Sequence, residues 1–171
     1  MKKYEFDKES LIKDADNLLK QLFSICRSIT GEGLRDTLNI IRETTNFNIK
    51  EIPSGEIFYD WKIPLEWEIN EAYIEDSKGE KIINFENSNL HVINYSSPID
   101  AELSFDELKD HLYTLPDLPD AIPYRTTYYN ETWGFCLTHK QLRKFNKNEI
   151  YKVFIDSTFS KGSLTLGDKV L

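Results

Sequence analysis

Two residues with metal-binding side chains, Cys136 and His139, stand three positions apart in this sequence of 171 residues. A C-x-x-H pair can present two ligands to a zinc ion, but a structural zinc site needs four ligands, usually from two such pairs. The sequence contains no second pair of this kind. We therefore expect no metal ion held by this chain alone. The simpler interpretation makes Cys136 a small core residue on a strand and His139 a surface residue in the first turn of a helix.

The same pair is the candidate for nucleophilic catalysis, as a thiolate and its base. Cys136 and His139 are three positions apart across an expected strand-to-helix turn, which is poor geometry for a hydrogen bond between them, and the sequence has no G-x-S-x-G motif. The stretch TGEGL at residues 30–34 lacks both the spacing of a dinucleotide-binding loop and the lysine of a P-loop. We assign no catalytic residue and interpret the glycines as a tight turn between helices.

A third candidate is the aromatic segment YRTTYYNETWGFCLTH, residues 124–139. Tyr128, Tyr129 and Trp133 offer flat rings with polar rims, and Arg125 offers a planar group that suits a carboxylate. Such a set can line a pocket for a peptide end or a sugar. The alternative is a sheet that carries half-exposed tyrosines with their hydroxyl groups in water. The residues alone leave both interpretations open.

The composition of the sequence indicates which class of protein carries these candidate residues. The apolar share of 40%, the charged share of 29% and the length favour one soluble globular domain with room for an inserted subdomain. A net charge of −8 argues against a general affinity for nucleic acid or anionic lipid. The sequence has no signal peptide and no run of about 18 apolar residues. Cys26 and Cys136 form no disulfide pattern, so we expect reduced thiols and a cytoplasmic protein.

The first 52 residues predict two helices and a strand. Apolar residues at three- and four-residue steps between Leu11 and Cys26 indicate a helix, capped by Asp7 or by Ser10. The glycines of SITGEG end it, and a second helix with Leu34, Leu38 and Ile41 on one face follows. The segment NFNIKEI, residues 46–52, alternates as a strand does.

The sequence pattern changes at residue 53, where the first proline occurs and a segment with strand-like patterns follows. Strands are expected at 71–76, 81–85 and 91–96, with a capping box at Ser104–Glu107 before a short helix. Thr138 is expected to cap a helix over residues 139–145. The segments 150–156 and 163–171, separated by SKG at 160–162, are predicted to form a hairpin.

Five blocks of this sequence resemble a bacterial family of aminopeptidase-like proteins, long described as domains of unknown function and in some members linked to polysaccharide biosynthesis. The resemblance covers about residues 18 to 171. The blocks are ICRSITGEGLRDTL, EIPSGEIFYDWKIPLEWEINEAYI, NSNLHVINYSSPID, LKDHLYTLPDLPDAIPYRTTYY and WGFCLTHKQL.

The resemblance implies an α+β or α/β fold that is the N-terminal part of a zinc-exopeptidase-like α/β domain with an inserted, mainly antiparallel β subdomain. Residues 1–52 would be the opening helices and first strand of that domain, 53–120 the insert, and 121–171 the aromatic segment, a short helix and a hairpin that returns to the peptidase-like sheet. In the family, a His-x-Cys-His-Pro-like strand end and an Asn-Asp-Asn-like stretch carry the metal and would follow Leu171. None of those ligands can be assigned here, so this chain is expected to be an N-terminal fragment or a truncated product.

Two functions follow from the resemblance. In the first, the chain belongs to a metal-dependent aminopeptidase-like hydrolase that acts on a peptide or another small molecule, with zinc held outside these residues. The chain would then supply only a wall of the substrate pocket, for which the candidates are Arg125, Tyr128, Tyr129, Trp133 and His139. In the second, it is a non-catalytic module that binds a glycan or a partner protein. The end of the predicted hairpin would leave an unpaired strand edge, so self-association is also expected.

Overall fold

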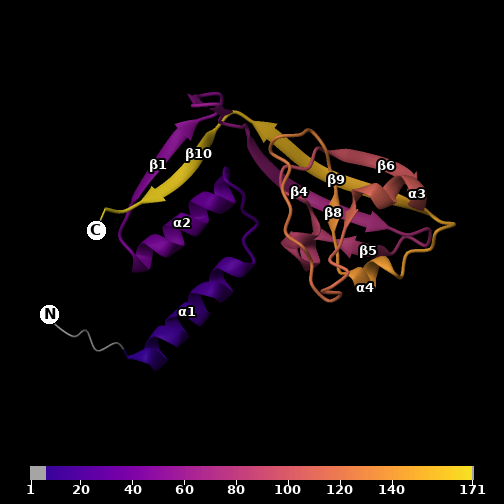
Figure 1. Ribbon diagram of the computed structural model, residues 1–171, viewed down its shortest axis with the longest axis horizontal. Helices are drawn as coiled ribbons and strands as arrows, with labels where there is room; N and C mark the ends of the chain where they lie inside the picture. Colours follow the sequence, from indigo (N-terminus) through magenta and orange to yellow (C-terminus); the bar gives the residue numbers. More distant parts are fainter. Residues whose placement is uncertain (1–6, 171) are drawn as a thin grey trace.

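The computed structural model describes residues 7–170, which form two lobes joined by long strands (Figure 1). We call the first the helical lobe; it consists of α1 (Lys8–Phe23), α2 (Glu32–Thr44), β1 (Asn48–Pro53) and β10 (Ser163–Asp168). We call the second the sheet lobe; its sheet consists of β4 (Glu66–Glu75), β5 (Lys81–Asn84), β6 (Ile99–Ser104) and β9 (Ile150–Ser160). The described part of the chain is thus a mixed α/β protein with mainly antiparallel sheets.

The helical lobe begins as the sequence predicts. The carboxylate of Asp7 caps α1 by accepting hydrogen bonds from the amides of Glu9 and Ser10. The turn before α2 needs its glycines: Gly31 has φ = +85°, and a Cβ on Gly33 would lie 1.9 Å from the carbonyl oxygen of Cys26. The predicted tight turn is wrong in its extent, because α1 ends at Phe23 and not at Cys26 and residues 24–31 connect the helices, with Gly33 already inside α2.

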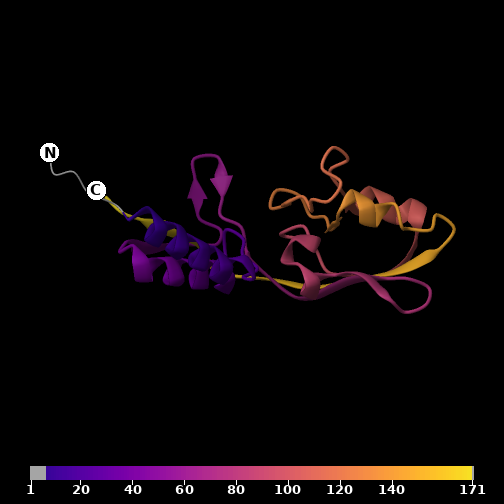
Figure 2. The same ribbon diagram turned by 90° about the horizontal axis from the view of Figure 1, so that it is seen from below.

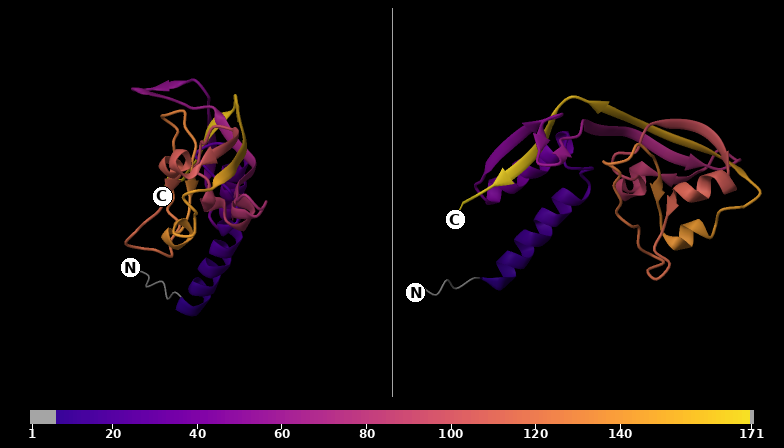
Figure 3. Two further views of the ribbon diagram at one scale, coloured as in Figure 1. Left: turned by 90° about the vertical axis from the view of Figure 1, so that its right-hand side faces the viewer. Right: turned by 45° about the horizontal axis from the view of Figure 1, so that its top comes forward.

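Strands β1 and β10 pair antiparallel along their whole length, from Asn48 opposite Asp168 to Pro53 opposite Ser163. Helix α2 lies beside this pair, whereas α1 reaches away from it (Figure 3). Gly167 makes the packing possible, since a Cβ there would lie 2.7 Å from the ring of Phe47. A small hairpin of β2 (Ile57–Phe58) and β3 (Trp61–Lys62) connects β1 to the sheet lobe and stands apart from both lobes (Figure 2).

The four strands of the sheet lobe lie in the order β5-β4-β9-β6, with antiparallel neighbours throughout. Alternate residues of β4 and β9 point to one face, where Ile74, Val153 and Ile155 are fully buried. Helices α3 (Phe105–Leu108) and α4 (His139–Leu142) and the connecting loops cover that face (Figure 2). The sheet therefore has a covered inner face and a solvated outer face, as antiparallel sheets commonly do.

Both predicted helix caps of this lobe are confirmed. Ser104 and Glu107 form a complete capping box at the start of α3. Thr138 caps α4 and forms a second box with Gln141. However, α4 ends at Leu142 and not at residue 145, because Lys144 and Phe145 bond to carbonyls only three residues earlier and the chain tightens into a turn.

The prediction of a strand over residues 91–96 is wrong. The chain forms two 3-10 helices, Phe85–Asn87 and Asn89–His91, and then only isolated bridges, from Val92 to Phe135 and from Asn94 to Thr126. Tyr95 has φ = +69°, which no regular strand accommodates, and Ser96 turns back to bond the carbonyl of Ile93. The sheet takes β6 in its place.

The predicted hairpin over residues 150–171 is also wrong, because its two strands belong to different sheets. Strand β9 has β4 on one edge and, along residues 150–155, β6 on the other. The chain instead passes through Gly162 into the helical lobe, where β10 pairs with β1.

The sheet lobe also contains a short parallel pair of strands. Strand β7 (Leu112–Tyr113) follows the 3-10 helix Lys109–His111 and pairs with β8 (Phe135–Cys136). None of the helices within residues 7–170 has the length and apolar character of a membrane span.

Candidate functional site

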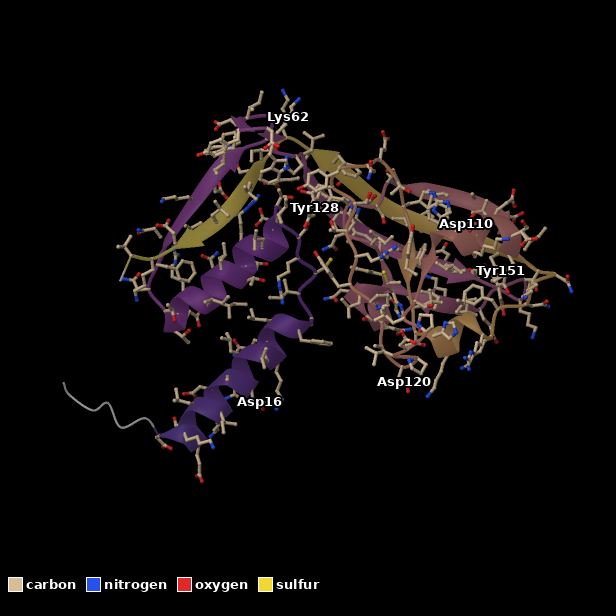
Figure 4. All side chains as sticks on the ribbon, viewed as in Figure 1. Asp16, Lys62, Asp110, Asp120, Tyr128 and Tyr151 are labelled. Atoms are coloured by element: carbon tan, nitrogen blue, oxygen red, sulfur yellow. The ribbon has the colours of Figure 1, made fainter. Side chains whose placement is uncertain are left out.

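The aromatic segment begins as a loop, residues 124–132, that is held against Asn94. The amide of Asn94 donates to the carbonyl of Arg125 at 3.0 Å, and the amide of Thr127 donates to the carbonyl of Asn94 at 2.9 Å. Tyr128 lies in this loop, near the junction of the two lobes (Figure 4). Residues of this loop line two cavities, and Thr127 lines both of them.

The first cavity, which we call the junction cavity, has a volume of about 400 Å³. Its wall combines the loop with the segment before β4 and the end of β9. Tyr128 packs edge-on against Tyr95 with ring centroids 5.1 Å apart, and Tyr129 packs edge-on against Tyr128 at 5.6 Å. Phe159 contacts the other side of Tyr95, with ring centroids 6.1 Å apart. The cavity is lined by Leu65, Tyr95, Thr127, Tyr128, Tyr129, Asn130, Glu131 and Phe159.

Tyr95 forms the buried base of this cavity in an unusual backbone conformation. Its φ of +69° is rare for a bulky residue, and such strain costs about 1–3 kcal/mol. Its hydroxyl is hydrogen bonded to Thr30 Oγ1 at 2.6 Å and donates to the carbonyl of Leu65 at 3.0 Å. Burial raises the pKa of this phenol to about 12, so it stays protonated at neutral pH. These two hydrogen bonds connect the Tyr95 ring to the segment between α1 and α2 and to the segment just before β4.

The second cavity, which we call the arginine cavity, has a volume of about 450 Å³. The guanidinium carbon of Arg125 lies 4.2 Å from the centroid of the Tyr113 ring, within the range of a cation–π contact. Three threonines share the cavity with these two residues. Its lining consists of Ile93, Tyr113, Tyr124, Arg125, Thr126, Thr127 and Thr132.

The structure brings Arg125, Tyr128 and Tyr129 together on one loop, but it places Trp133 and His139 elsewhere. Trp133 stacks on the imidazole of His111 with centroids 3.8 Å apart, and its carbonyl accepts a hydrogen bond from His111 Nδ1 at 2.9 Å. His139 lies in the first turn of α4. Its Nδ1 is 3.0 Å from the hydroxyl of Thr114. Neither side chain lines the junction cavity or the arginine cavity.

Sequence reasoning missed Leu65, Tyr95, Glu131 and Phe159 as lining residues. Three of them come from segments distant in sequence, and only pairing of β4 with β9 brings Leu65 and Phe159 to one end of the sheet.

Cys136 and His139 are weak candidates for catalysis or for a zinc site. Cys136 is fully buried, and burial raises the pKa of its thiol to about 12, so it is not a nucleophile at neutral pH. The hydroxyl of Thr114 occupies His139 Nδ1, which leaves only Nε2 to bind a metal. Within residues 7–170, no three histidine, cysteine, aspartate or glutamate side chains form a group that could hold a metal. We therefore derive no chemical step through a metal at this pair.

Comparisons with known proteins place this geometry in a family. The family described as "Domain of unknown function (DUF2172)" matches residues 66–158, more than half of the chain. A protein from Clostridium acetobutylicum named "Putative polysaccharide biosynthesis protein with aminopeptidase-like domain" is 48% identical over 152 residues, which are 89% of this chain and 35% of that protein.

A crystal structure described as a "putative peptidase" from Clostridium acetobutylicum has the same fold. It superposes with a TM-score of 0.86 and 46% identity over 92% of this chain and 37% of that one. The chain thus spans about a third of the length of these relatives. On the match over residues 66–158, the chain belongs to the DUF2172 family.

Proposed function

We propose that this chain supplies the substrate-recognition wall of an aminopeptidase-like hydrolase whose bond-breaking groups lie outside these 171 residues. Two observations support the proposal: relatives about two and a half times as long carry names with peptidase or aminopeptidase-like in them, and within residues 7–170 no three metal-binding side chains form a group that could hold a metal. In this proposal zinc would be held by other parts of such a hydrolase. Within this chain the role is to bind and orient a peptide or another small molecule.

The observation that carries the proposal is the junction cavity. Its volume of about 400 Å³ lies in the range of ligand sites, which are mostly apolar, carry a few polar groups and favour the boundaries between domains. The exposed fractions of Tyr129 and Phe159 are 75% and 40%, so these rings are available to a ligand. Strained Tyr95 is typical of a functional site, where the surroundings hold an unfavourable backbone in place.

We further propose that residues 1–52 and the end of the chain belong to a peptidase-like unit of zinc-exopeptidase type, with residues 53–120 as the insert. The pairing of β1 with β10 supports this division, since it joins the first and last strands in one sheet. The free cysteines Cys26 and Cys136 support a location in the cytoplasm, where thiols stay reduced.

A titration followed by nuclear magnetic resonance tests the proposal. The amide signals of Tyr128, Tyr129 and Phe159 should shift when short peptides with an apolar N-terminal residue are added to the chain. Tyr129→Ala should weaken this binding about fivefold, because an aromatic contact contributes about 1 kcal/mol. Tyr59→Ala is the matched control, since Tyr59 is 98% exposed on the β2–β3 hairpin. Peptides that leave the cavity signals unmoved would refute the role.

The second candidate is a non-catalytic module that binds glycans or a partner protein. The name of the relative, which refers to polysaccharide biosynthesis, and the exposed ring of Tyr129, which suits stacking on a sugar, favour it. The same titration with neutral oligosaccharides separates the two candidates. Shifts at Tyr129 with oligosaccharides and none with peptides would select the module.

A further inference from the structure

Arg125 holds its guanidinium in a fixed position at the edge of the arginine cavity. The guanidinium carbon lies over the ring of Tyr113, 4.2 Å from its centroid, which is within the range of a cation–π contact. A stacked guanidinium loses less freedom when it binds a ligand than a free one does. The cavity beside it, of about 450 Å³, has room for a small ligand.

The backbone that carries Arg125 is fixed as well. Asn94, which is only 5% exposed, bonds the main chain of the loop on both sides of Thr126, at Arg125 and at Thr127. Its side-chain amide donates to the carbonyl of Arg27 at 3.0 Å and to the hydroxyl of Tyr124 at 3.2 Å. The cavity wall is therefore built before any ligand arrives.

The charge of Arg125 is not balanced by a neighbour. Among residues 7–170, no acidic side chain forms a salt bridge with it, although the chain carries 29 acidic against 21 basic residues. Two further side chains of the cavity, Thr126 and Thr132, bring hydroxyl groups that can donate to an anion. An oriented cation with hydroxyl donors around it suits a planar anion.

We propose that the arginine cavity binds a carboxylate group of the ligand. The planar guanidinium matches a carboxylate with two parallel N–H···O bonds, and Thr126 and Thr132 donate to the same group. Because Thr127 lines both cavities, a ligand that enters the junction cavity can place its carboxylate here; this last step rests on the proposed function.

The test compares matched probes that differ in charge. N-acetylalanine should shift the amide signals of Thr126 and Thr127 and the Nε signal of Arg125, whereas N-acetylalaninamide, its neutral counterpart, should not. Glucuronate and glucose form the second pair. Preference for N-acetylalanine over glucuronate indicates a peptide terminus as the source of the carboxylate, and the reverse preference indicates an acidic sugar.

Variants separate recognition by Arg125 from general charge effects. Arg125→Gln should weaken binding of the carboxylate at least about tenfold, because a charge-assisted hydrogen bond is lost. Arg125→Lys should recover only part of it, since a lysine lacks the planar fork. Arg143→Gln, an equal change of charge at the exposed end of α4, should have no effect. Thr132→Val should weaken binding in a protein whose fold is checked by its amide spectrum.

Three results would overturn the carboxylate site: equal shifts with N-acetylalaninamide, full binding by Arg125→Gln, or tighter binding of inorganic phosphate than of N-acetylalanine. The proposed function is tested apart from it. If neutral peptides still bind in the junction cavity and lose affinity with Tyr129→Ala, only the carboxylate site has failed.

Discussion

At the scale of single residues, His91 shows how burial sets a protonation state. Its side chain is 4% exposed, and Nδ1 donates to the carbonyl of Cys136 at 2.7 Å. Burial lowers the pKa of His91 below its ordinary value of 6.5, because the charged ring would lose its hydration; the bond to Cys136 opposes this only in part. In the folded protein the ring is therefore neutral over a wider range of pH than in the unfolded chain.

This difference predicts a dependence of stability on pH. Below pH 6.5 the unfolded chain binds a proton at His91 that the folded protein does not, so the free energy of unfolding decreases as the pH falls from 6.5 toward the lower pKa of the fold. Above pH 6.5, His91 is neutral in both the folded and the unfolded chain, so its titration no longer changes the free energy of unfolding. Urea unfolding at pH 7.5 and at pH 5.5 measures the effect, with pH values chosen about one unit to either side of the ordinary pKa.

The control variant is His91→Asn, which keeps an N–H donor for the carbonyl of Cys136 but cannot take up a proton. His111 and His139 remain in both proteins, so their contributions cancel in the comparison. The loss of stability between the two pH values should be smaller in His91→Asn. An equal loss in both proteins would show that His91 is not the group responsible.

Lining residues of the two cavities could be predicted from residue types only where they are neighbours in sequence. Arg125, Tyr128 and Tyr129 share one loop, but Arg125 lines one cavity and the two tyrosines line the other. Trp133 was grouped with them for its aromatic ring and its nearness in sequence, but the chain enters the core right after it. A Cβ at Gly134 would lie 2.6 Å from Ile93. Tyr95 could not be predicted, because neither its positive φ nor its distant ring contacts leave a sequence pattern.

At the scale of elements, one ion pair connects three of them at the junction of the lobes. The guanidinium of Arg35 on α2 donates twice to Glu66 at the start of β4, at 2.8 and 2.7 Å. The same carboxylate oxygen accepts from the amide of Ser163, the first residue of β10, at 2.8 Å. Arg35 is only partly shielded, whereas Glu66 is buried.

Glu66→Gln should therefore lower the free energy of unfolding by about 2 kcal/mol, since it removes the buried charge that faces Arg35. The loss is below that of a fully buried pair because Arg35 contacts solvent and also pairs with Glu32 and Glu51. Urea unfolding measures it. Glu68→Gln is the matched control, an identical substitution on the exposed face of the same strand, and should change stability by less than about 0.5 kcal/mol. Equal losses from both variants would mean that the ion pair does not connect the lobes energetically.

The elements that sequence predicted well are those with local causes. Asp7, Ser104 and Thr138 cap helices through bonds to amides two or three residues away, and Gly31 imposes its turn through its own φ. Strand pairing has no local cause. The apolar alternation of residues 163–166 is the same whether β10 pairs with β9 or with β1, so it does not specify the partner strand.

At the scale of the whole molecule, the helical lobe leaves apolar surface without a partner. Helix α1 has no buried residue, and four of its large apolar side chains are more than half exposed: Leu11, Ile12, Leu19 and Phe23. The β1–β10 pair is a sheet of two strands, which is marginal without further packing. The sheet lobe, in contrast, has a core of fully buried side chains. The described structure thus combines one self-sufficient lobe with one that has an open apolar face.

We therefore expect the isolated chain to self-associate through α1 and not through a hairpin edge at residues 150–171. Leu19→Glu combined with Phe23→Glu should raise the dissociation constant of the assembly at least about tenfold, because each buried apolar side chain contributes about 1.5–3 kcal/mol. Sedimentation equilibrium over a range of concentrations measures it. Gln21→Glu with Asn17→Glu adds the same charge at other positions of the helix and should leave the association largely intact. A wild-type chain that stays monomeric at all concentrations would show that the apolar side chains of α1 do not mediate association, and this prediction would be wrong.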